Sequence, residues 1–289
     1  DKALFWIEDA HRCGVTTLNL SGGETMCYPY LFDVIRAASE KDITCNVALS
    51  GYRFDSKSLD SLISAGVSGI FISLNGSTDE INRKSRNGFA LSMHALQILR
   101  NANYKNTTIN WVMQSTNADD FPNIVRIAEY YHVSRVVVLG IKPDSRNDLK
   151  NYPSYSQMQY VRNYIITYRG TVDLRVESCF SPLLALLGES FLFGNSNTGL
   201  YKGCLAGLVS LSINVDGLLT PCRHLYYPES WNSMSEYWEN SPILKRIRSL
   251  ENERREPCSS CKLGEYCRHC LAITSNTSDE IYIGNPSFS

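Results

Sequence analysis

The first half of the sequence alternates short β-rich runs with segments of helical periodicity. Apolar residues recur at the i, i+3, i+4, i+7 spacing of a helix with one buried face, as at Leu31, Val34, Ile35 and Ala38. Five β-rich runs lie between such segments, at residues 16–20, 44–49, 69–74, 108–113 and 135–140. Five strands, each followed by a helix, predict an α/β fold with a parallel sheet and right-handed crossovers, either doubly wound or a barrel.

Length and charge narrow the class of protein. A chain of 289 residues with 43% hydrophobic content can bury one large core and a smaller one. The formal net charge of -1 shows no basic excess, so we expect no nucleic-acid partner. The longest apolar runs, such as residues 136–139, are too short to span a bilayer, and we expect no membrane partner. No secretory signal opens the chain, which favours a cytoplasmic location.

Glycine and polar residues stand where the expected strands end. The first strand leads into Gly22, Gly23 and Glu24. The two glycines let the backbone turn sharply and approach a ligand, whose ammonium group the carboxylate could hold. A plain turn with a solvated acid is the alternative. Further polar residues at strand ends are Ser50, Ser73, Asn75 and Gln114. Both sheet architectures bind ligands at the carboxyl ends of the strands, so we expect a site there.

Six cysteines crowd the region between residues 204 and 270. They are Cys204, Cys222, Cys258, Cys261, Cys267 and Cys270. Thiolates select zinc or iron-sulfur clusters, and closely spaced cysteines let one loop wrap a metal site. Structural disulfides are an alternative that the missing secretory signal disfavours. A single four-cysteine zinc site would use the last four of these residues and leave the first two without a role.

These motifs together resemble radical S-adenosylmethionine (SAM) enzymes with a C-terminal SPASM domain. The resemblance rests on Gly-Gly-Glu, on Ser-Leu-Asn-Gly at residues 73–76, on Arg86, and on the spacings Cys-x12-Gly-x4-Cys and Cys-x2-Cys-x5-Cys-x2-Cys. It implies a partial (β/α)6 TIM-like barrel over residues 1–170 and a small cysteine-rich SPASM domain over residues 171–289.

The resemblance also implies SAM as a cofactor. The amino group of SAM is expected at Gly22, Gly23 and Glu24. Its ribose and carboxylate are expected near Ser73, Asn75 and Arg86. Further contacts are expected at Ser50, Gln114 and Leu139. For Arg86, a solvated position in the basic run 83–86 is the alternative.

The same resemblance implies 4Fe-4S clusters: one radical cluster and up to two auxiliary clusters. The radical cluster's Cys-x3-Cys-x2-Cys loop and the strand before it are expected upstream of residue 1, because the chain opens in the first helix, with Leu4, Ile7, Ala10 and His11 on one side. Expected ligands of the first auxiliary cluster are Cys204, Cys222 and Cys270. Those of the second are Cys258, Cys261 and Cys267, and Cys179 is a candidate to complete a cluster. The remaining cysteines fit no single loop and are expected to be buried thiols: Cys13, Cys27 and Cys45.

The implied activity is radical modification of a peptide. Cleavage of SAM by one electron from flavodoxin or ferredoxin yields a 5′-deoxyadenosyl radical, which takes a hydrogen atom from a ribosomally made peptide to form a thioether or carbon-carbon crosslink. Arg223 follows Cys222 where sulfatase-maturing members carry a catalytic aspartate, which disfavours that alternative activity. A non-catalytic, metal-stabilised peptide-binding scaffold is the remaining alternative.

Overall fold

The computed structural model describes residues 2–188, 203–250, 253–262, 267–278 and 280–284. The chain divides into two compact units. Unit 1 comprises residues 1–138 and 167–175, and unit 2 comprises residues 139–166 and 176–289. The expected domain boundary after residue 170 stays a prediction.

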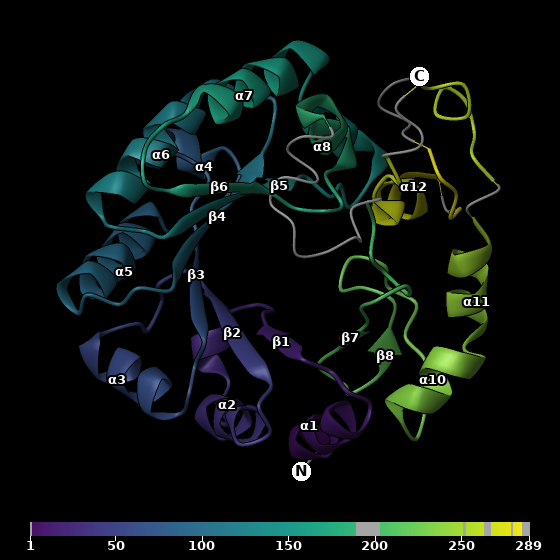
Figure 1. Cartoon of the computed structure of the whole chain (residues 1–289), viewed down its shortest axis with the longest axis horizontal. Helices are drawn as coiled ribbons and strands as arrows, with labels where there is room; N and C mark the ends of the chain where they lie inside the picture. The colour runs from purple at the N-terminus through teal and green to yellow at the C-terminus, as the bar shows by residue number, and fades with distance from the viewer. Residues whose placement is uncertain (1, 189–202, 251–252, 263–266, 279, 285–289) are drawn as a thin grey trace. The chain divides into compact units, whose positions relative to one another are not determined.

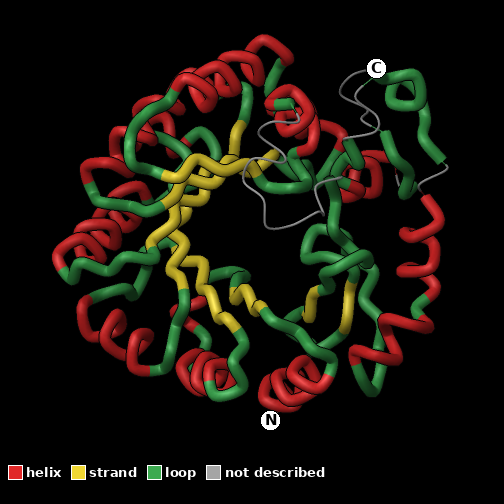
Figure 2. Tube along the Cα trace, in the orientation of Figure 1, coloured by secondary structure: helices red, strands yellow, loops and turns green. Residues whose placement is uncertain are grey.

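One six-stranded sheet carries the strands β1 (Thr17–Leu20), β2 (Thr44–Leu49), β3 (Gly69–Ser73), β4 (Thr107–Met113), β5 (Arg135–Gly140) and β6 (Asp173–Val176). They lie side by side in chain order, and the pairs β1/β2, β2/β3 and β3/β4 are parallel. A doubly wound sheet reverses its strand order at a switch point, whereas the wall of a (β/α) barrel keeps chain order. The α/β fold with partial-barrel order is therefore confirmed, and the sheet has one strand, β6, beyond the five expected. Figure 2 draws the strands in yellow and the helices in red.

The helices of unit 1 alternate with the strands, except that two helices lie between β3 and β4. They are α1 (Lys2–Arg12), α2 (Leu31–Ser39), α3 (Ser56–Ser64), α4 (Asp79–Arg83), α5 (Phe89–Asn101) and α6 (Phe121–Tyr130), with the short 3-10 turns η1 (Thr25–Cys27) and η2 (Ala118–Asp120). Figure 1 shows α2, α3 and α5 on one side of strands β1 to β4. The expected apolar face of α2 is confirmed, since all four of its residues are buried. The core of unit 1 therefore lies between these helices and the sheet.

The buried face of α1 differs from the expected one. Ile7 and Ala10 are buried as expected, but Leu4 and His11 are exposed. Trp6 lies in the buried face with Ile7 and Ala10. Trp6 lies one turn before Ala10, so both point to the same side of the helix. The large ring of Trp6 buries more apolar surface than Leu4 could, and α1 therefore turns this side toward the core.

Unit 2 holds the remaining elements. These are η3 (Arg146–Asn151), α7 (Tyr155–Thr167), α8 (Ser181–Leu187), the antiparallel pair β7 (Ser212–Ile213) and β8 (Leu219–Thr220), α10 (Met234–Asn240), α11 (Pro242–Ser249) and α12 (Leu271–Ser278). The last residue of α7 and the ends of β5 and β6 cross the division between the units. Across the described ranges, no helix combines the length and apolar character needed to cross a membrane.

Candidate functional site

The turn after β1 borders open space. Gly22 has a φ of +138°, which residues with a side chain rarely adopt. A Cβ atom added at Gly22 or Gly23 would meet no heavy atom within 4 Å. Glu24 follows and is half-buried. The backbone here leaves room for a ligand to come close to the Glu24 carboxylate.

The Glu24 carboxylate is fixed against the end of β2. The backbone N–H of Ser50 donates to its Oε2 at 3.3 Å, and the Ser50 hydroxyl donates to the same oxygen. The N–H of Met26 donates to Oε1 at 3.5 Å. Next to it, the Thr25 hydroxyl donates to the carbonyl of Ala48 at 2.8 Å. These bonds tie the ends of β1 and β2 together and hold a negative charge at the carboxyl edge of the sheet.

Arg86 supplies the opposite charge near Glu24. Its side chain is partly buried, and its Nε is a buried donor with no hydrogen-bond partner within the described ranges. Burial lowers the pKa of the Arg86 guanidinium, and the negative charge of Glu24 opposes that shift. An unpaired buried donor is costly, so the site favours a ligand that brings an acceptor. A carboxylate beside an open turn, together with an arginine whose Nε lacks a partner, fits an amino acid zwitterion, which is one end of SAM.

The loop that carries Arg86 is held by a buried asparagine that the sequence did not single out. Asn82 in α4 is 0% exposed. Its Oδ1 accepts from the N–H of Asn75 at 2.8 Å, and its Nδ2 donates to the carbonyl of Arg86 at 2.9 Å. Asn82 therefore ties the end of β3 to the backbone of Arg86. The only sign of this role in the sequence is an asparagine at a position where the short helix α4 faces the core.

Asn75 is engaged within the protein. Its Nδ2 donates to the Ser85 hydroxyl at 3.0 Å, and its Oδ1 accepts from the N–H of Val112 at 2.9 Å. Asn117, also not anticipated, donates to the carbonyls of Asn75 and Val112 at 2.9 Å. In this structure Asn75 therefore positions the ends of β3 and β4, and its contact with SAM stays a prediction.

The other expected SAM contacts are also placed at strand ends. Ser73 is the last residue of β3 and is half-buried, with its carbonyl accepting from the Ser92 hydroxyl at 3.0 Å. Gln114 follows β4 and is buried. Leu139 is the next-to-last residue of β5 and is half-buried. Their contacts with a cofactor stay predictions.

Four cysteines from separate segments of unit 2 form a first cysteine group: Cys179, Cys204, Cys222 and Cys270. The thiols of Cys179 and Cys270 are hydrogen-bonded to each other. Burial raises the pKa of Cys204 to about 11, and negative charge on Cys179 adds to the shift. Burial also raises the pKa of Cys222, again with a contribution from Cys179. Cys179, only a candidate from the sequence, thus lies among the three expected ligands of the first auxiliary cluster.

Local structure explains how two of these cysteines are positioned. β7 and β8 form a hairpin whose turn needs Gly217, with a φ of +76°. Within that turn, Asn214 Oδ1 accepts from the N–H of Leu218 at 2.9 Å, and Cys222 follows β8. The N–H of Cys204 donates to the carbonyl of Arg268 at 2.8 Å, two residues before Cys270. The glycine of the Cys-x12-Gly-x4-Cys spacing therefore makes the hairpin, and backbone pairing brings Cys204 toward Cys270.

A buried ion pair adjoins the first cysteine group. Glu177, just after β6, accepts from the N–H of Gly140 at 2.7 Å and pairs with Lys142, and its other oxygen accepts from Cys179 Sγ at 3.5 Å. The side chains of Lys142 and Glu177 are 10% and 17% exposed. Burial alone would lower the pKa of Lys142, but the negative charges of Glu177, Cys179 and Cys270 raise it overall. Lys142 therefore stays protonated and places a positive charge among these thiols.

Cys258, Cys261 and Cys267 form a second cysteine group. Burial raises the pKa of Cys267 to about 11, a hydrogen bond from Ser181 opposes the shift, and negative charge on the other two thiols adds to it. Arg254 Nη1 donates to the carbonyl of Cys267 at 2.8 Å. Cys270 interacts with Cys179 in the first group. The last four cysteines therefore do not form the single tetrahedral zinc site that the sequence left open.

Ligand spacing separates the metal alternatives further. Around a single zinc ion four sulfurs lie roughly 3.8 Å apart, from the Zn–S bond of about 2.3 Å, whereas a cluster core holds its ligands farther apart. Within the described ranges, no group of three or more His, Cys, Asp or Glu side chains could hold a single metal ion. Two loose groups of thiols fit clusters better than they fit zinc.

Three cysteines lie outside both groups. All ten cysteines fall in described ranges, and none forms a disulfide. Cys45 on β2 is buried, which raises its pKa to about 12. Cys13 and Cys27 are exposed, so the expectation that they are buried is wrong. Cys13 lies in the turn after α1 and Cys27 ends η1, and neither position faces the core.

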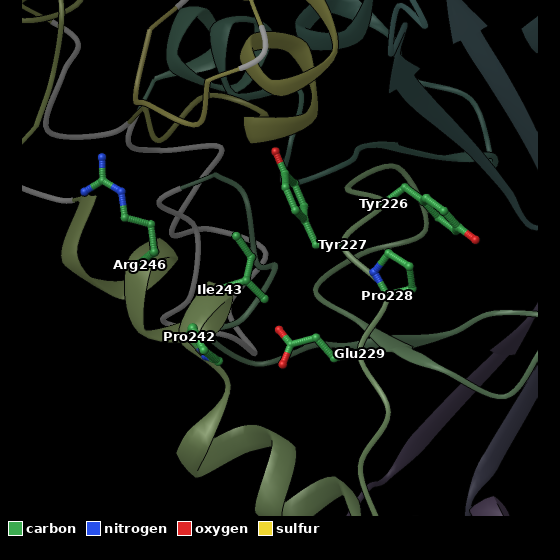
Figure 3. Close-up of a pocket in the computed structure, with 7 residues that line it drawn as sticks. All are labelled: Tyr226, Tyr227, Pro228, Glu229, Pro242, Ile243 and Arg246. Atoms are coloured by element: carbon green, nitrogen blue, oxygen red, sulfur yellow. The ribbon is translucent and has the colours of Figure 1, made fainter.

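A pocket of about 550 Å³ lies elsewhere in unit 2. Its lining comes from the segment after β8 and from α11, which face each other in Figure 3: Tyr226, Tyr227, Pro228, Glu229, Pro242, Ile243 and Arg246. Glu229 accepts from Trp231 and Ser241, and Arg246 pairs with Glu253. Both charges already have partners, and no expected site residue lines the pocket.

Comparison with known proteins identifies the family. The model of the radical SAM superfamily matches residues 1–149, more than half of the chain. The chain belongs to the radical SAM superfamily. This membership confirms the resemblance seen in the sequence, and with it an enzyme that uses SAM and a 4Fe-4S cluster. The open turn at Gly22 and Gly23 and the unpaired Arg86 donor fit that cofactor.

Individual relatives align with nearly the whole of this chain. It is 21% identical over 287 residues to the AdoMet-dependent heme synthase of Methanosarcina barkeri, covering 94% of this chain and 82% of the relative. It is 26% identical over 271 residues to the PqqA peptide cyclase of Ruegeria pomeroyi, covering 88% and 68%. The crystal structure of Streptococcus suis SuiB bound to the precursor peptide SuiA is similar with a TM-score of 0.76 and 17% identity, covering 99% and 68%. At that identity the likeness shows the fold.

Proposed function

We propose that this radical SAM enzyme is a peptide maturase that crosslinks, or modifies in a related way, a ribosomally made peptide. The observation that carries the proposal is the first cysteine group, in which thiols from four segments of unit 2 lie near enough to interact electrostatically. A second group of three thiols accompanies it. The names of two relatives, a peptide cyclase and an enzyme bound to its precursor peptide, support a peptide as the substrate.

The cradle at the sheet edge would hold the amino acid end of SAM. Glu24 would accept from the ammonium group, and Arg86 Nε would donate to the carboxylate. Gly22 and Gly23 leave the space for this approach. We assign the remaining contacts to residues at the ends of β2 to β5: Ser50, Ser73, Asn75, Gln114 and Leu139. When bound, SAM and the radical cluster supply a 5′-deoxyadenosyl radical that takes a hydrogen atom from the peptide.

The two cysteine groups would hold the two auxiliary clusters. We assign Cys179, Cys204, Cys222 and Cys270 to the first, and Cys258, Cys261 and Cys267 to the second. Four thiolates gather negative charge in a buried place, and the Lys142 ammonium would offset part of it. We assign residues 1–170 to the SAM-binding domain and residues 171–289 to the auxiliary-cluster domain.

The setting of the reaction follows from its chemistry. We propose flavodoxin or ferredoxin as the electron donor, because SAM cleavage requires single electrons at low potential. Cysteine-bound clusters persist in a reducing compartment, so we propose that the enzyme lies in the cytoplasm.

A second candidate is radical chemistry on a tetrapyrrole. Its support is the heme synthase of Methanosarcina barkeri, which aligns over larger shares of both chains than the peptide cyclase does. The peptide cyclase has the higher identity. We favour the peptide because two relatives are named for peptides.

Label transfer from substrate to cofactor would separate the candidates. Cells of the source organism are grown on deuterated amino acids, and a small-peptide fraction and an organic extract of tetrapyrroles are prepared from them. Each is incubated anaerobically with the enzyme, SAM and dithionite, and the mass of 5′-deoxyadenosine is measured. We expect deuterium to arrive from the peptide fraction and to be lost after protease digestion of that fraction.

Other outcomes count against the proposal. Deuterium from the organic extract alone would favour the tetrapyrrole reaction. No label from either fraction would count against both candidate substrates. A Glu24→Gln variant serves as the control, since it should reduce label transfer from any substrate by weakening SAM binding.

A further inference from the structure

A buried serine contacts the second cysteine group. Ser181, the first residue of α8, is 0% exposed, and its Oγ lies 3.1 Å from Cys267 Sγ. No sequence motif indicates this contact, because 86 positions separate Ser181 from Cys267. A fully buried hydroxyl normally has a hydrogen-bond partner, and here the partner is a sulfur expected to bind iron.

The position of Ser181 is fixed by its neighbours in unit 2. Phe180 is 1% exposed, and its N–H donates to the carbonyl of Glu177 at 3.0 Å. Its ring packs so closely on Gly140 that a Cβ atom there would lie 2.8 Å from it. At the other end of α8, Arg162 Nε donates to the carbonyl of Leu186 at 2.6 Å. The helix is anchored at both ends, so the Ser181 hydroxyl stays directed at Cys267.

Metal binding decides the direction of this hydrogen bond. Either atom could donate when Cys267 is a thiol. A cysteine that binds iron is a thiolate and carries no proton, so the serine hydroxyl must then donate. A donor to a ligand sulfur draws electron density from the cluster and favours its reduced, more negative form. Hydrogen bonds to cluster sulfurs are among the factors that set reduction potential.

We propose that the Ser181 hydroxyl donates a hydrogen bond to the Cys267 thiolate and raises the reduction potential of the cluster held by Cys258, Cys261 and Cys267. This inference rests on the proposed function, since it needs a cluster at the second cysteine group. Ser181 is a positioning and tuning residue, and it does not bind iron. It makes this cluster a better acceptor of one electron than the same three thiolates without the hydroxyl.

A redox titration of a single variant tests the proposal. Ser181→Ala and the parent are purified anaerobically and titrated with detection by electron paramagnetic resonance. The wave lost in Cys258→Ala marks the second cluster. In Ser181→Ala we expect unchanged iron content and a fall in the ratio of reduced to oxidised second cluster on the order of tenfold at fixed potential, equivalent to about 59 mV for one electron. Ser241→Ala, another fully buried serine at a helix start, should leave the potential unchanged.

Three results would overturn the inference. An unchanged potential in Ser181→Ala would show that the hydroxyl does not act on the cluster. A loss of iron in that variant would show that Ser181 binds the metal itself. A parent protein without a cluster at the second group would overturn the cluster assignment of the proposed function as well, and this result is distinguishable because it is seen before any variant is made.

Discussion

Replacing Glu24 with glutamine should weaken SAM binding while leaving the fold intact. The Glu24 carboxylate accepts from two Ser50 donors and from Met26, and a glutamine side-chain oxygen can keep the Ser50 bonds. The negative charge that faces the SAM ammonium is lost. A hydrogen bond to a charged group contributes roughly 1.5–3 kcal/mol, so the dissociation constant should rise by about 10- to 150-fold.

Equilibrium binding of SAM to the anaerobically purified enzyme measures this effect, with thermal unfolding recorded in parallel. Glu40→Gln is the matched control, because Glu40 is an exposed acid at the end of α2 and should leave affinity unchanged. A Glu24→Gln affinity within twofold of the parent would refute the reasoning, since the Gly-Gly-Glu segment would then be only a turn.

Further variants test the rest of the two sites. Arg86→Gln should lower SAM affinity by about tenfold or more in the same binding assay, because a charged partner of the carboxylate is lost, whereas exposed Arg83→Gln should not. Asn82→Ala should weaken SAM binding severalfold and lower the melting temperature, because it frees the Arg86 backbone from the end of β3; unchanged affinity would remove Asn82 from the site. Lys142→Met should lower the melting temperature more than Lys41→Met, because breaking a buried ion pair costs about 3–5 kcal/mol and the Lys41 pair is more exposed. Equal falls in melting temperature would show that the Lys142–Glu177 pair stabilises the fold no more than the exposed Lys41 pair does.

Local patterns predicted most of the sheet but not its last strand. β2 and β5 have the expected bounds, since each is a β-rich run closed by turn residues. β6 is four residues long, and its Asp173 pairs both with Arg175 in the same strand and with Arg135 of β5. Val172, Leu174 and Val176 alternate with the two charged residues, which is the period-2 signal of a half-buried strand. This signal is weaker than the apolar runs of the other five strands, so the strand is not among those predicted.

The parts of the site that the sequence missed depend on contacts between distant segments. Asn117 bonds to the carbonyl of Asn75 across 42 positions, and Lys142 pairs with Glu177 across 35. These side chains satisfy buried backbone groups or charges that exist only once the chain has folded. Gly-Gly-Glu and the spacing of Cys258, Cys261 and Cys267 are visible in advance because their residues are close in the sequence.

Metal content of the anaerobically purified enzyme tests most directly whether the two cysteine groups hold clusters. Two cubane sites predict about eight irons and eight acid-labile sulfides beyond the radical cluster. Cys222→Ala and Cys258→Ala should each lose about four of these irons, whereas Cys45→Ala, which removes a buried thiol outside both groups, should lose none. Stoichiometric zinc without acid-labile sulfide, or full iron content in Cys222→Ala, would contradict the assignment.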